Sequence, residues 1–396
     1  MPPTYKIYVV GGAVRDALMG LPVKDRDYVV VGATPEQMKA EGFIAVGKDF
    51  PVFLHPTTHE EYALARTERK TAPGYTGFAF HAAPDVTLEQ DLQRRDLTIN
   101  AIAQDTDGTL IDPCDGQADI KNKVFRHVST AFAEDPVRIL RLARFAARFI
   151  EFSVAPQTAN LMHQMVESGE ADALVSERVW QEIARGLMEE RPSCMFAVLR
   201  ECGALKRLMP ELDGLLNQSI DTQSDLSTTT AAAIIMNELD IAAQAGVSLP
   251  IRFSVIAYHL ASEQLALDLC HRLKLPNEVK DLAVMAARER YTILGTTEMA
   301  ADSIVKLLER CDAFRKTDRF KDLLTLHELI HRSSNDDGVL FSIKLLQASL
   351  ESAQSINAGQ IAATVAIEYP QNPAHHIAAA VHAARVSAVQ CVVNHR

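Results

Sequence analysis

The spacing of apolar residues changes along the chain and divides it into two parts. From residue 5 to about 115, short β-branched apolar runs alternate with glycine- and proline-containing turns, which is typical of an α/β region. After Phe149 the apolar residues recur with a helical period. The pattern therefore predicts an α+β protein with an α/β N-terminal part and an all-helical remainder. Helices are predicted over 158–167, 175–188, 195–208 and 231–245.

The stretch from Lys6 to Val31 predicts a strand, a tight turn, a short helix and a second strand. The apolar run Ile7–Val10 is typical of a buried strand, and Gly11 and Gly12 end it. The helix and the second strand are expected over 13–19 and 24–31. A further helix is expected over 90–103, and loops over 69–88, 217–230 and 333–338.

Two carboxylates stand at the start of the expected second strand. Residues i and i+2 of a strand point to the same face, so Asp25 and Asp27 are predicted to lie side by side, with Arg26 on the other face. Adjacent carboxylates repel each other unless a cation lies between them. Because Mg²⁺ prefers carboxylate oxygens combined with substrate phosphate, the pair predicts a magnesium site.

The Gly11-Gly12 turn offers backbone N–H groups to an anion, and Arg15 lies one turn into the helix that follows. Together with the carboxylate pair, these features predict a Mg²⁺–triphosphate site. Glu61 starts another expected strand and is a candidate for a third carboxylate. Each feature taken singly is common on solvated surfaces, and that alternative stays open for Glu61 in particular.

An arginine-rich helix is predicted over 134–148. Its four arginines form one stripe about 120° wide, with apolar residues on the opposite side. A stripe of this kind is often a solvated face, but it contains no lysine, and arginine suits planar recognition of phosphates and bases. Asp135 lies one turn before the first arginine and can pair with it. The arginines of the stripe are Arg138, Arg141, Arg144 and Arg148.

Composition limits the possible partners of the 396-residue chain. No apolar run reaches the length of about 18 residues that a membrane helix needs, so no membrane span is expected. Six scattered cysteines without a Cys-x-x-Cys motif suit a reducing cytoplasm and offer no zinc site. A net charge of −11 argues against sequence-blind binding of nucleic acid, so an RNA contact needs a local basic patch. Candidate patches are Lys206-Arg207, 272–280 and 315–321.

Four motifs, VGGAVRD (10–16), KDRDYVV (24–30), RRDLTINA (94–101) and EDPVRILRLARFAAR (134–148), resemble those of bacterial class II tRNA nucleotidyltransferases, the CCA-adding enzymes. That class also contains bacterial poly(A) polymerases. The resemblance is close from Lys6 to about Glu211 and weaker afterwards. It implies a polymerase-β-like nucleotidyltransferase head over 1–133, a helical neck over 134–212 that selects the nucleotide, and a helical body and tail over 213–396 that bind tRNA.

The resemblance also implies CCA addition to the tRNA 3′ end without a template, with CTP and ATP as substrates and Mg²⁺ as cofactor. We expect a cytoplasmic, monomeric enzyme. Metal binding is implied for Asp25 and Asp27, with Glu61 as the third acidic position. Asp96 is expected to brace the site. Triphosphate binding and base selection are implied for Gly11, Gly12, Arg15, Arg95, Asp135, Arg138, Arg141 and Arg144.

Donor and acceptor chemistry agrees with the role of Asp135 and Arg138 in base selection. A carboxylate can accept from the exocyclic NH₂ of cytosine or adenine while a guanidinium donates to the adjacent ring nitrogen. Uracil and guanine reverse both positions, which leaves polar groups unpaired. The alternatives are a poly(A) polymerase, an enzyme that adds only CC or only A, and a non-catalytic RNA-binding protein.

Many relatives carry a phosphohydrolase module whose metal is held around an adjacent His-Asp pair. The matching positions here are Tyr258 and His259, and no His-Asp dipeptide occurs in the chain. Tyrosine is a poor metal ligand near neutral pH because its pKa is about 10. The sequence therefore predicts a degenerate module without phosphohydrolase activity.

Overall fold

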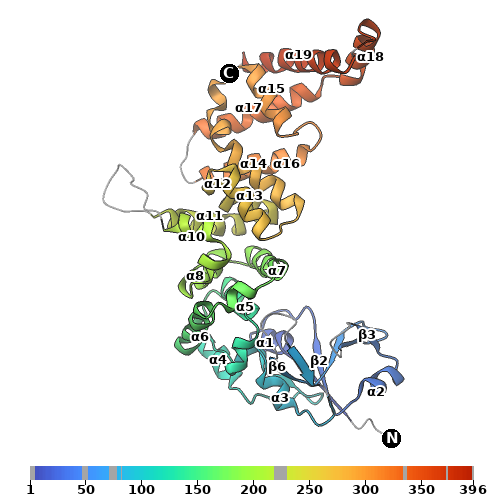
Figure 1. The fold of residues 1–396 in the computed structure, drawn as a ribbon, viewed down its shortest axis with the longest axis vertical. Helices are drawn as coiled ribbons and strands as arrows, with labels where there is room; N and C mark the ends of the chain where they lie inside the picture. Colours follow the sequence, from blue (N-terminus) through green and yellow to red (C-terminus); the bar gives the residue numbers. More distant parts are fainter. Residues whose placement is uncertain are drawn as a thin grey trace. The chain divides into compact units, whose positions relative to one another are not determined.

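The computed structural model divides into two compact units, Met1–Pro210 and Glu211–Arg396, called here the N-terminal and C-terminal units (Figure 1). Each is described by itself. The α+β prediction is confirmed, since a mixed sheet is followed by a largely helical remainder. The structure describes residues 5–46, 52–70, 78–81, 83–217, 230–332, 337–371 and 373–394.

The N-terminal unit contains a seven-stranded mixed sheet in the order β3-β4-β5-β2-β1-β8-β9. Antiparallel pairing of β1 with β2 places Val10 opposite Asp27, and parallel pairing of β2 with β5 places Asp27 beside Glu61. The loop after β1 and the starts of β2 and β5 therefore meet at one end of the sheet. The strands are β1 (Lys6–Val10), β2 (Asp27–Val31), β3 (Ile44–Val46), β4 (Val52–Leu54), β5 (Glu61–Leu64), β8 (Ala103–Gln104) and β9 (Leu110–Ile111).

Two apolar clusters cover the sheet. One packs Val10 and Val29 against Leu92 of α3 (Leu88–Gln93). The other packs Val30 against Met38 of α2 (Pro35–Ala40) and includes residues of β4 and β5. Because successive strand residues point to opposite faces, the run Val29-Val30 supplies both clusters and makes β2 a central strand.

Four expected boundaries of strands and helices differ from the structure. The helix expected over 134–148 begins at Val137, after a 3-10 turn over Thr130–Glu134. The second strand begins at Asp27 and not at Lys24. The helix expected over 90–103 ends at Gln93, because the Asp96 carboxylate accepts hydrogen bonds from the Leu97 N–H and from Asn100 and so favours a separate 3-10 turn. The helix expected over 195–208 is divided into two helices at Gly203, whose φ is 80°.

The loop expected over 69–88 contains part of a hairpin. Strand β6 (Thr67–Lys70) pairs antiparallel with β7 (Phe78–His81), so the loop prediction was wrong for these residues. Residues 71–77 and 82 lie outside the described residues, as do 218–229 and 333–336 of the other two expected loops. The last loop prediction was wrong for Asp337 and Gly338, which begin helix α17 (Asp337–Gln354).

The remaining helices of the N-terminal unit pack around α5 (Val137–Arg148). Its apolar face, with Ile139, Leu142 and Ala143 almost fully buried, contacts α7 and α8. A Cβ on Gly186 of α7 would lie 2.2 Å from the sulfur of Met195, so glycine permits the close approach of α7 and α8. The other helices are α1 (Gly12–Leu18), α4 (Gly116–Asn122), α6 (Pro156–Glu167), α7 (Ser176–Leu187), α8 (Pro192–Glu201) and α9 (Ala204–Leu208).

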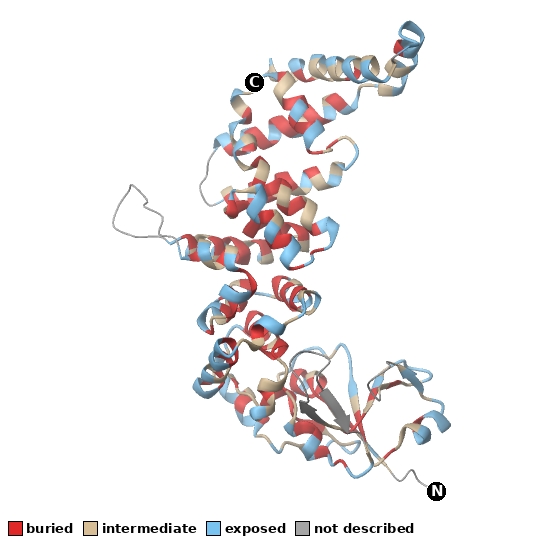
Figure 2. Cartoon of the chain, viewed as in Figure 1, coloured by how far each residue is buried: buried red, intermediate tan, exposed pale blue. Residues whose placement is uncertain are grey.

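The described part of the C-terminal unit is helical. Its core forms where α12 packs along α14, with Phe253 and Ala286 fully buried. Buried residues are concentrated on these helices, whereas α18 and α19 bury few (Figure 2). The helices are α10 (Pro210–Leu216), α11 (Ala231–Gln244), α12 (Leu249–Leu260), α13 (Glu263–Arg272), α14 (Asn277–Leu294), α15 (Ala301–Arg310), α16 (Thr317–His331), α17 (Asp337–Gln354), α18 (Ala358–Glu368) and α19 (Pro373–Val393).

Helix α19 is long and apolar enough to cross a membrane by length and composition, and within the described ranges it is the one helix that is. Those criteria are a weak indication, because core helices of proteins without a membrane span also meet them. The helix packs against α15, α17 and α18, and its His382 lies 3.0 Å from carboxylate oxygens of both Asp302 and Glu309 on α15.

Candidate active site

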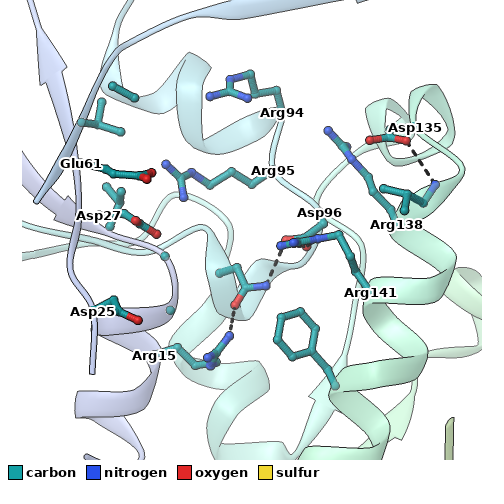
Figure 3. Close-up of a pocket in the computed structure, with 18 of the residues that line it drawn as sticks. Arg15, Asp25, Asp27, Glu61, Arg94, Arg95, Asp96, Asp135, Arg138 and Arg141 are labelled. Atoms are coloured by element: carbon teal, nitrogen blue, oxygen red, sulfur yellow. Dashed lines mark hydrogen bonds and ion pairs between the residues drawn. The ribbon is translucent and has the colours of Figure 1, made fainter. Parts of the chain in front are cut away.

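A cavity of about 800 Å³ in the N-terminal unit is lined by all twelve residues that were expected at the site, Asp96 included (Figure 3). Its wall carries ten arginines and five carboxylates, without lysine or histidine. The excess of five positive charges suits a polyanion such as a triphosphate. The charged lining residues are Arg15, Arg66, Arg94, Arg95, Arg138, Arg141, Arg144, Arg148, Arg178, Arg185, Asp25, Asp27, Glu61, Asp96 and Asp135.

The predicted carboxylates gather on one wall of the cavity. Asp25 and Asp27 both line it and Arg26 does not, although Asp25 precedes the strand. Glu61 reaches the same wall from β5, the strand that pairs with β2 (Figure 3). Partial burial raises the pKa of Asp27, the positive charge of Arg95 opposes this rise, and the nearby Asp25 carboxylate adds to it. Because the carboxylates of Asp25 and Asp27 repel each other, a cation bound between them would be stabilised.

The donor set fits Mg²⁺ better than a metal enclosed by protein ligands. Among the described residues, no three histidine, cysteine, aspartate or glutamate side chains are arranged to hold a metal ion together. Magnesium is commonly bound by one or two carboxylates and takes its other ligands from water and substrate phosphates. The pair Asp25 and Asp27, facing an arginine-lined cavity, meets that description.

Gly11 forms the sharp turn between β1 and α1. Its φ of 71° lies in the left-handed region, and a Cβ there would lie 3.1 Å from an Nη atom of Arg95. Its N–H donates to the carbonyl of Ile102 at 3.3 Å. The contribution of Gly11 is therefore the turn and the space beside Arg95, and the N–H groups that the turn offers to an anion begin at Gly12.

Arg15 is an anchored side chain and not a mobile one. It is 3% exposed, donates to the Asp16 carboxylate at 2.7 and 2.8 Å, and donates to Asn100 at 2.5 Å. Its guanidinium lies 5.0 Å from the ring centroids of Phe145 and Phe149. Burial lowers the pKa of Arg15, and the contact with Asp16 opposes that shift. Sequence reasoning missed Asp16 and Asn100, which hold this arginine at the floor of the cavity.

Arg95 points across the cavity toward Asp27 and Glu61 (Figure 3). One of its Nη atoms contacts the fully buried Asp91 at 3.1 Å. Its Nε atom is buried and has no hydrogen-bond partner in the described part of the chain. A guanidinium that is fixed from behind and faces the carboxylate wall is placed to contact an anionic ligand bound there.

The arginine stripe of α5 lines the cavity and contacts three other parts of the N-terminal unit. Arg141 donates to Asp96 at 2.9 Å, and Arg144 donates to the buried Glu182 of α7 at 2.6 Å. Arg148 contacts Asp16 at 2.8 Å. Burial of Asp96 would raise the pKa of its carboxyl, but the charge of Arg141 and the hydrogen bond from Asn100 keep that pKa well below its usual range.

The Asp135 carboxylate is held by a residue that sequence reasoning missed. Arg178 of α7 donates to both of its oxygens, at 3.2 and 2.8 Å, and the Val137 N–H donates to one of them at 3.2 Å. Arg138 donates to the carbonyl of Ala131 at 3.0 Å. The signal in the sequence was the spacing of charged residues along α7 at positions 178, 182 and 185, which places them on one helical face.

The pair of Asp96 and Arg141 yields a prediction about stability. We expect Asp96→Asn to lower the free energy of unfolding by about 2–3 kcal/mol at pH 7, below the full cost of breaking a buried pair because Arg141 is 37% exposed. Since the folded pKa of Asp96 is lowered, this stabilisation is complete well above the unfolded pKa of about 3.9, decreases as the pH falls below that value, and is lost once the pH passes through the folded pKa. Urea unfolding at pH 7 and pH 3 tests this, and an equal difference at both values would contradict it.

Two family models match the chain. The poly A polymerase head domain matches residues 7–126, and the probable RNA and SrmB-binding site of polymerase A matches 151–216. The chain is 54% identical to the multifunctional CCA protein of Herminiimonas arsenicoxydans, with 98% of each chain covered. It is also 54% identical to the multifunctional CCA protein of Janthinobacterium sp. strain Marseille, with 97% of each chain covered.

Solved structures share the fold. The CCA-adding enzyme of Bacillus stearothermophilus, in complex with CTP, matches with a TM-score of 0.69 at 23% identity, over 99% of this chain and 89% of that one. The Thermotoga maritima CCA-adding enzyme, complexed with tRNA, matches with a TM-score of 0.60 at 21% identity, over 88% of this chain and 79% of that one. At these identities the structural likeness concerns the fold alone.

Proposed function

Because the chain belongs to the family of multifunctional CCA proteins, we propose that it adds C, C and A to the 3′ end of tRNA from CTP and ATP without a template. The resemblance to this family in the motifs is thereby confirmed. The observation that carries the proposal is the cavity in which the carboxylate wall of Asp25 and Asp27 faces the arginine stripe of α5. Nucleotidyl transfer requires such a combination, since the transferring phosphate and the leaving pyrophosphate are both anionic.

The residues of the cavity divide the work of the proposed reaction. Nucleotidyltransferases of this family use a divalent metal, and we propose Mg²⁺ held by Asp25 and Asp27, with Glu61 beside them. A bound Mg²⁺ supplies positive charge to the attacking hydroxyl and the phosphate oxygens. Triphosphate binding is proposed for Arg95, which points toward Asp27 and Glu61, and for the N–H groups after Gly11. Arg15 is held in place by Asp16 and Asn100, and its proposed role is to present a fixed positive charge to the phosphates.

Base selection is proposed for Asp135 and Arg138, with Arg141 and Arg144 assisting at the base or the phosphates. Arg178 fixes both oxygens of Asp135, so the carboxylate cannot rotate freely to suit a different base. An acceptor held in this way favours the exocyclic NH₂ of cytosine and adenine over the carbonyl of uracil or guanine.

Within this proposal, residues 1–133 form the nucleotidyltransferase head, 134–212 the neck that selects the nucleotide, and 213–396 the body and tail that bind tRNA. The family model that matches 151–216 is described as a probable RNA- and SrmB-binding site, which supports contact between the neck and an RNA substrate. We propose that the enzyme acts in the cytoplasm.

A poly(A) polymerase is the alternative favoured by a specific observation, since the matching head model carries that description. One assay distinguishes the two.

Purified protein is incubated with Mg²⁺ and tRNA transcripts that lack CCA or end in CC, with each labelled nucleotide alone and with CTP and ATP together. CCA addition predicts growth by three nucleotides in the first transcript and by a single A in the second. Long A tails would contradict the proposal, and growth that stops after CC or needs a CC end would indicate partial addition.

The C-terminal unit yields a prediction of an absent activity. The Tyr258 hydroxyl lies 2.9 Å from a ring nitrogen of His331, and His259 is hydrogen-bonded to Glu238, so both side chains have partners within the protein. We expect no turnover of 2′,3′-cAMP or of a generic phosphomonoester with Ni²⁺, Mg²⁺ or Mn²⁺. Metal-dependent turnover that survives Asp25→Ala would show a second active site and contradict this prediction.

A further inference from the structure

A second charged cavity, of about 360 Å³, lies in the C-terminal unit where α14, the end of α15 and the start of α16 meet. It is called the basic pocket here. The structure joins two stretches that are separate in the sequence, one around 280–288 and the other at 310–319. The basic residues that line the pocket are Lys280, Arg288, Arg310, Arg315, Lys316 and Arg319.

Neighbouring carboxylates neutralise this positive charge only in part. Four carboxylates lie within ion-pair distance of the six basic residues, which leaves an excess of two positive charges, and no carboxylate of the described residues lies within that distance of Lys280. The paired acids are Glu263, Asp281, Glu289 and Asp312. A local excess of positive charge contrasts with the net charge of −11 of the whole chain.

The inner part of the pocket is held rigid. Glu289, whose side chain is 1% exposed, accepts from Arg310 at 2.7 and 2.6 Å and from Arg288 at 2.7 Å. Arg319 donates to Asp281 at 2.8 Å. These contacts fix guanidinium groups in a cavity open to solvent, so that little side-chain freedom remains to be lost when an anion binds.

The charged side chains in the outer part of the pocket contribute little to the stability of the fold. The side chain of Arg315 is 79% exposed and pairs with Asp312, while the Lys316 side chain is 50% exposed and lies 3.8 Å from Asp281. Exposed ion pairs of this kind contribute little to folding. The exposed cations are therefore available to a ligand from solution.

The lining indicates which anion the pocket suits. Its apolar members are Leu267, Val284 and Met285, and no aromatic side chain lines it. A site for bases would offer aromatic faces for stacking, whereas backbone phosphates are bound by arginine and lysine without regard to sequence. We propose that the basic pocket binds backbone phosphates of the tRNA, away from the 3′ end where nucleotides are added. This inference rests on the proposed function, which makes tRNA the substrate.

The test measures the affinity of the full-length protein for tRNA transcripts at several salt concentrations. We expect the triple variant Lys280→Ala, Arg315→Ala, Lys316→Ala to raise the Kd at least about tenfold near 0.1 M salt, equally for two unrelated tRNA sequences. The slope of log K against log salt should become shallower by about two to three. Binding of CTP in the absence of RNA should be unchanged, because the cavity of the N-terminal unit is intact.

A second variant tests the sign of the effect. Asp312 has a φ of 54°, a backbone conformation that asparagine adopts readily, so Asp312→Asn should fold normally. It removes a negative charge beside Arg315, and we expect tighter tRNA binding. A matched control neutralises three exposed lysines outside the pocket: Lys39→Ala, Lys121→Ala, Lys344→Ala.

The inference would be overturned if the triple variant of the pocket and the triple control variant had the same Kd for tRNA and the same salt dependence. In that case the basic pocket does not bind tRNA. Nucleotide addition by the wild-type protein to tRNA lacking CCA is measured in parallel, at saturating concentrations of RNA. Failure of that reaction would overturn the proposed function, while the comparison of Kd values would still decide whether the pocket binds RNA.

Discussion

Nucleotide addition is expected to disappear when Asp25 or Asp27 is replaced by alanine. The two side chains form one wall of the arginine-lined cavity, and removing either leaves a single carboxylate to hold the divalent metal. The loss of transition-state stabilisation should reach several kcal/mol, so we expect a fall in kcat of at least about a thousandfold for both C and A addition. The measurement is single-turnover extension of tRNA lacking CCA with labelled CTP and ATP.

The expected loss must be one of catalysis and not of folding or RNA binding. Affinity for tRNA should persist in both variants, because removing a carboxylate from the cavity makes it more positive. Asp107→Ala serves as the control, since Asp107 is an exposed aspartate of the same unit that does not line the cavity. Addition of C at a near wild-type rate by either cavity variant would contradict the role assigned to the pair.

Local patterns in the sequence predicted the features that depend on short stretches of chain. The strand before Gly11, the helix with its arginine stripe and the helical character after Phe149 all follow from periodicity and turn residues, and all are observed. The predicted neighbours Asp25 and Asp27 do share one wall, but Asp25 lies before the strand. The alternation of side chains along a strand therefore predicted the correct wall for Asp25, although Asp25 is not part of the strand.

Contacts between distant stretches could not be predicted in the same way. Asp96 ends the expected helix early because its side chain satisfies the Leu97 N–H, a competition that periodicity does not detect. The arginine stripe could be read as a solvated face until the structure paired Arg144 with Glu182 of another helix. The spacing along α7 showed a charged face, but only packing against α5 shows what that face contacts.

The same limit applies to Asp135, whose helical spacing suggested Arg138 as its partner. The structure adds Arg178, which is 43 positions away and holds both carboxylate oxygens. Interaction between residues this far apart depends on how α5 and α7 pack, because α7 is separated from Asp135 by α5 and α6 in the sequence. The contact with Arg178 changes what a substitution at Asp135 should do.

We expect Asp135→Ala to relax base selection more than it weakens binding of the triphosphate. Without the carboxylate, cytosine loses an acceptor for its NH₂ and the uracil carbonyl no longer faces a negative charge. Discrimination between CTP and UTP, measured as the ratio of kcat/KM values on tRNA lacking CCA, should fall by about a hundredfold. That loss is smaller than for a fully buried site, since the Asp135 side chain is 22% exposed.

Arg178→Lys separates the position of the carboxylate from its charge. Lysine keeps the positive charge but cannot donate to both oxygens in a fixed plane, so we expect a loss of discrimination of about tenfold with a nearly unchanged KM for CTP. Arg185→Lys is the matched control, because Arg185 lines the cavity from the same helix and forms its ion pair with Glu182, at 3.8 Å. If misincorporation of UMP and GMP stays at the wild-type level in Asp135→Ala while only nucleotide affinity falls, Asp135 acts as a structural residue at the start of α5. Arg178 would then serve to join α7 to that helix.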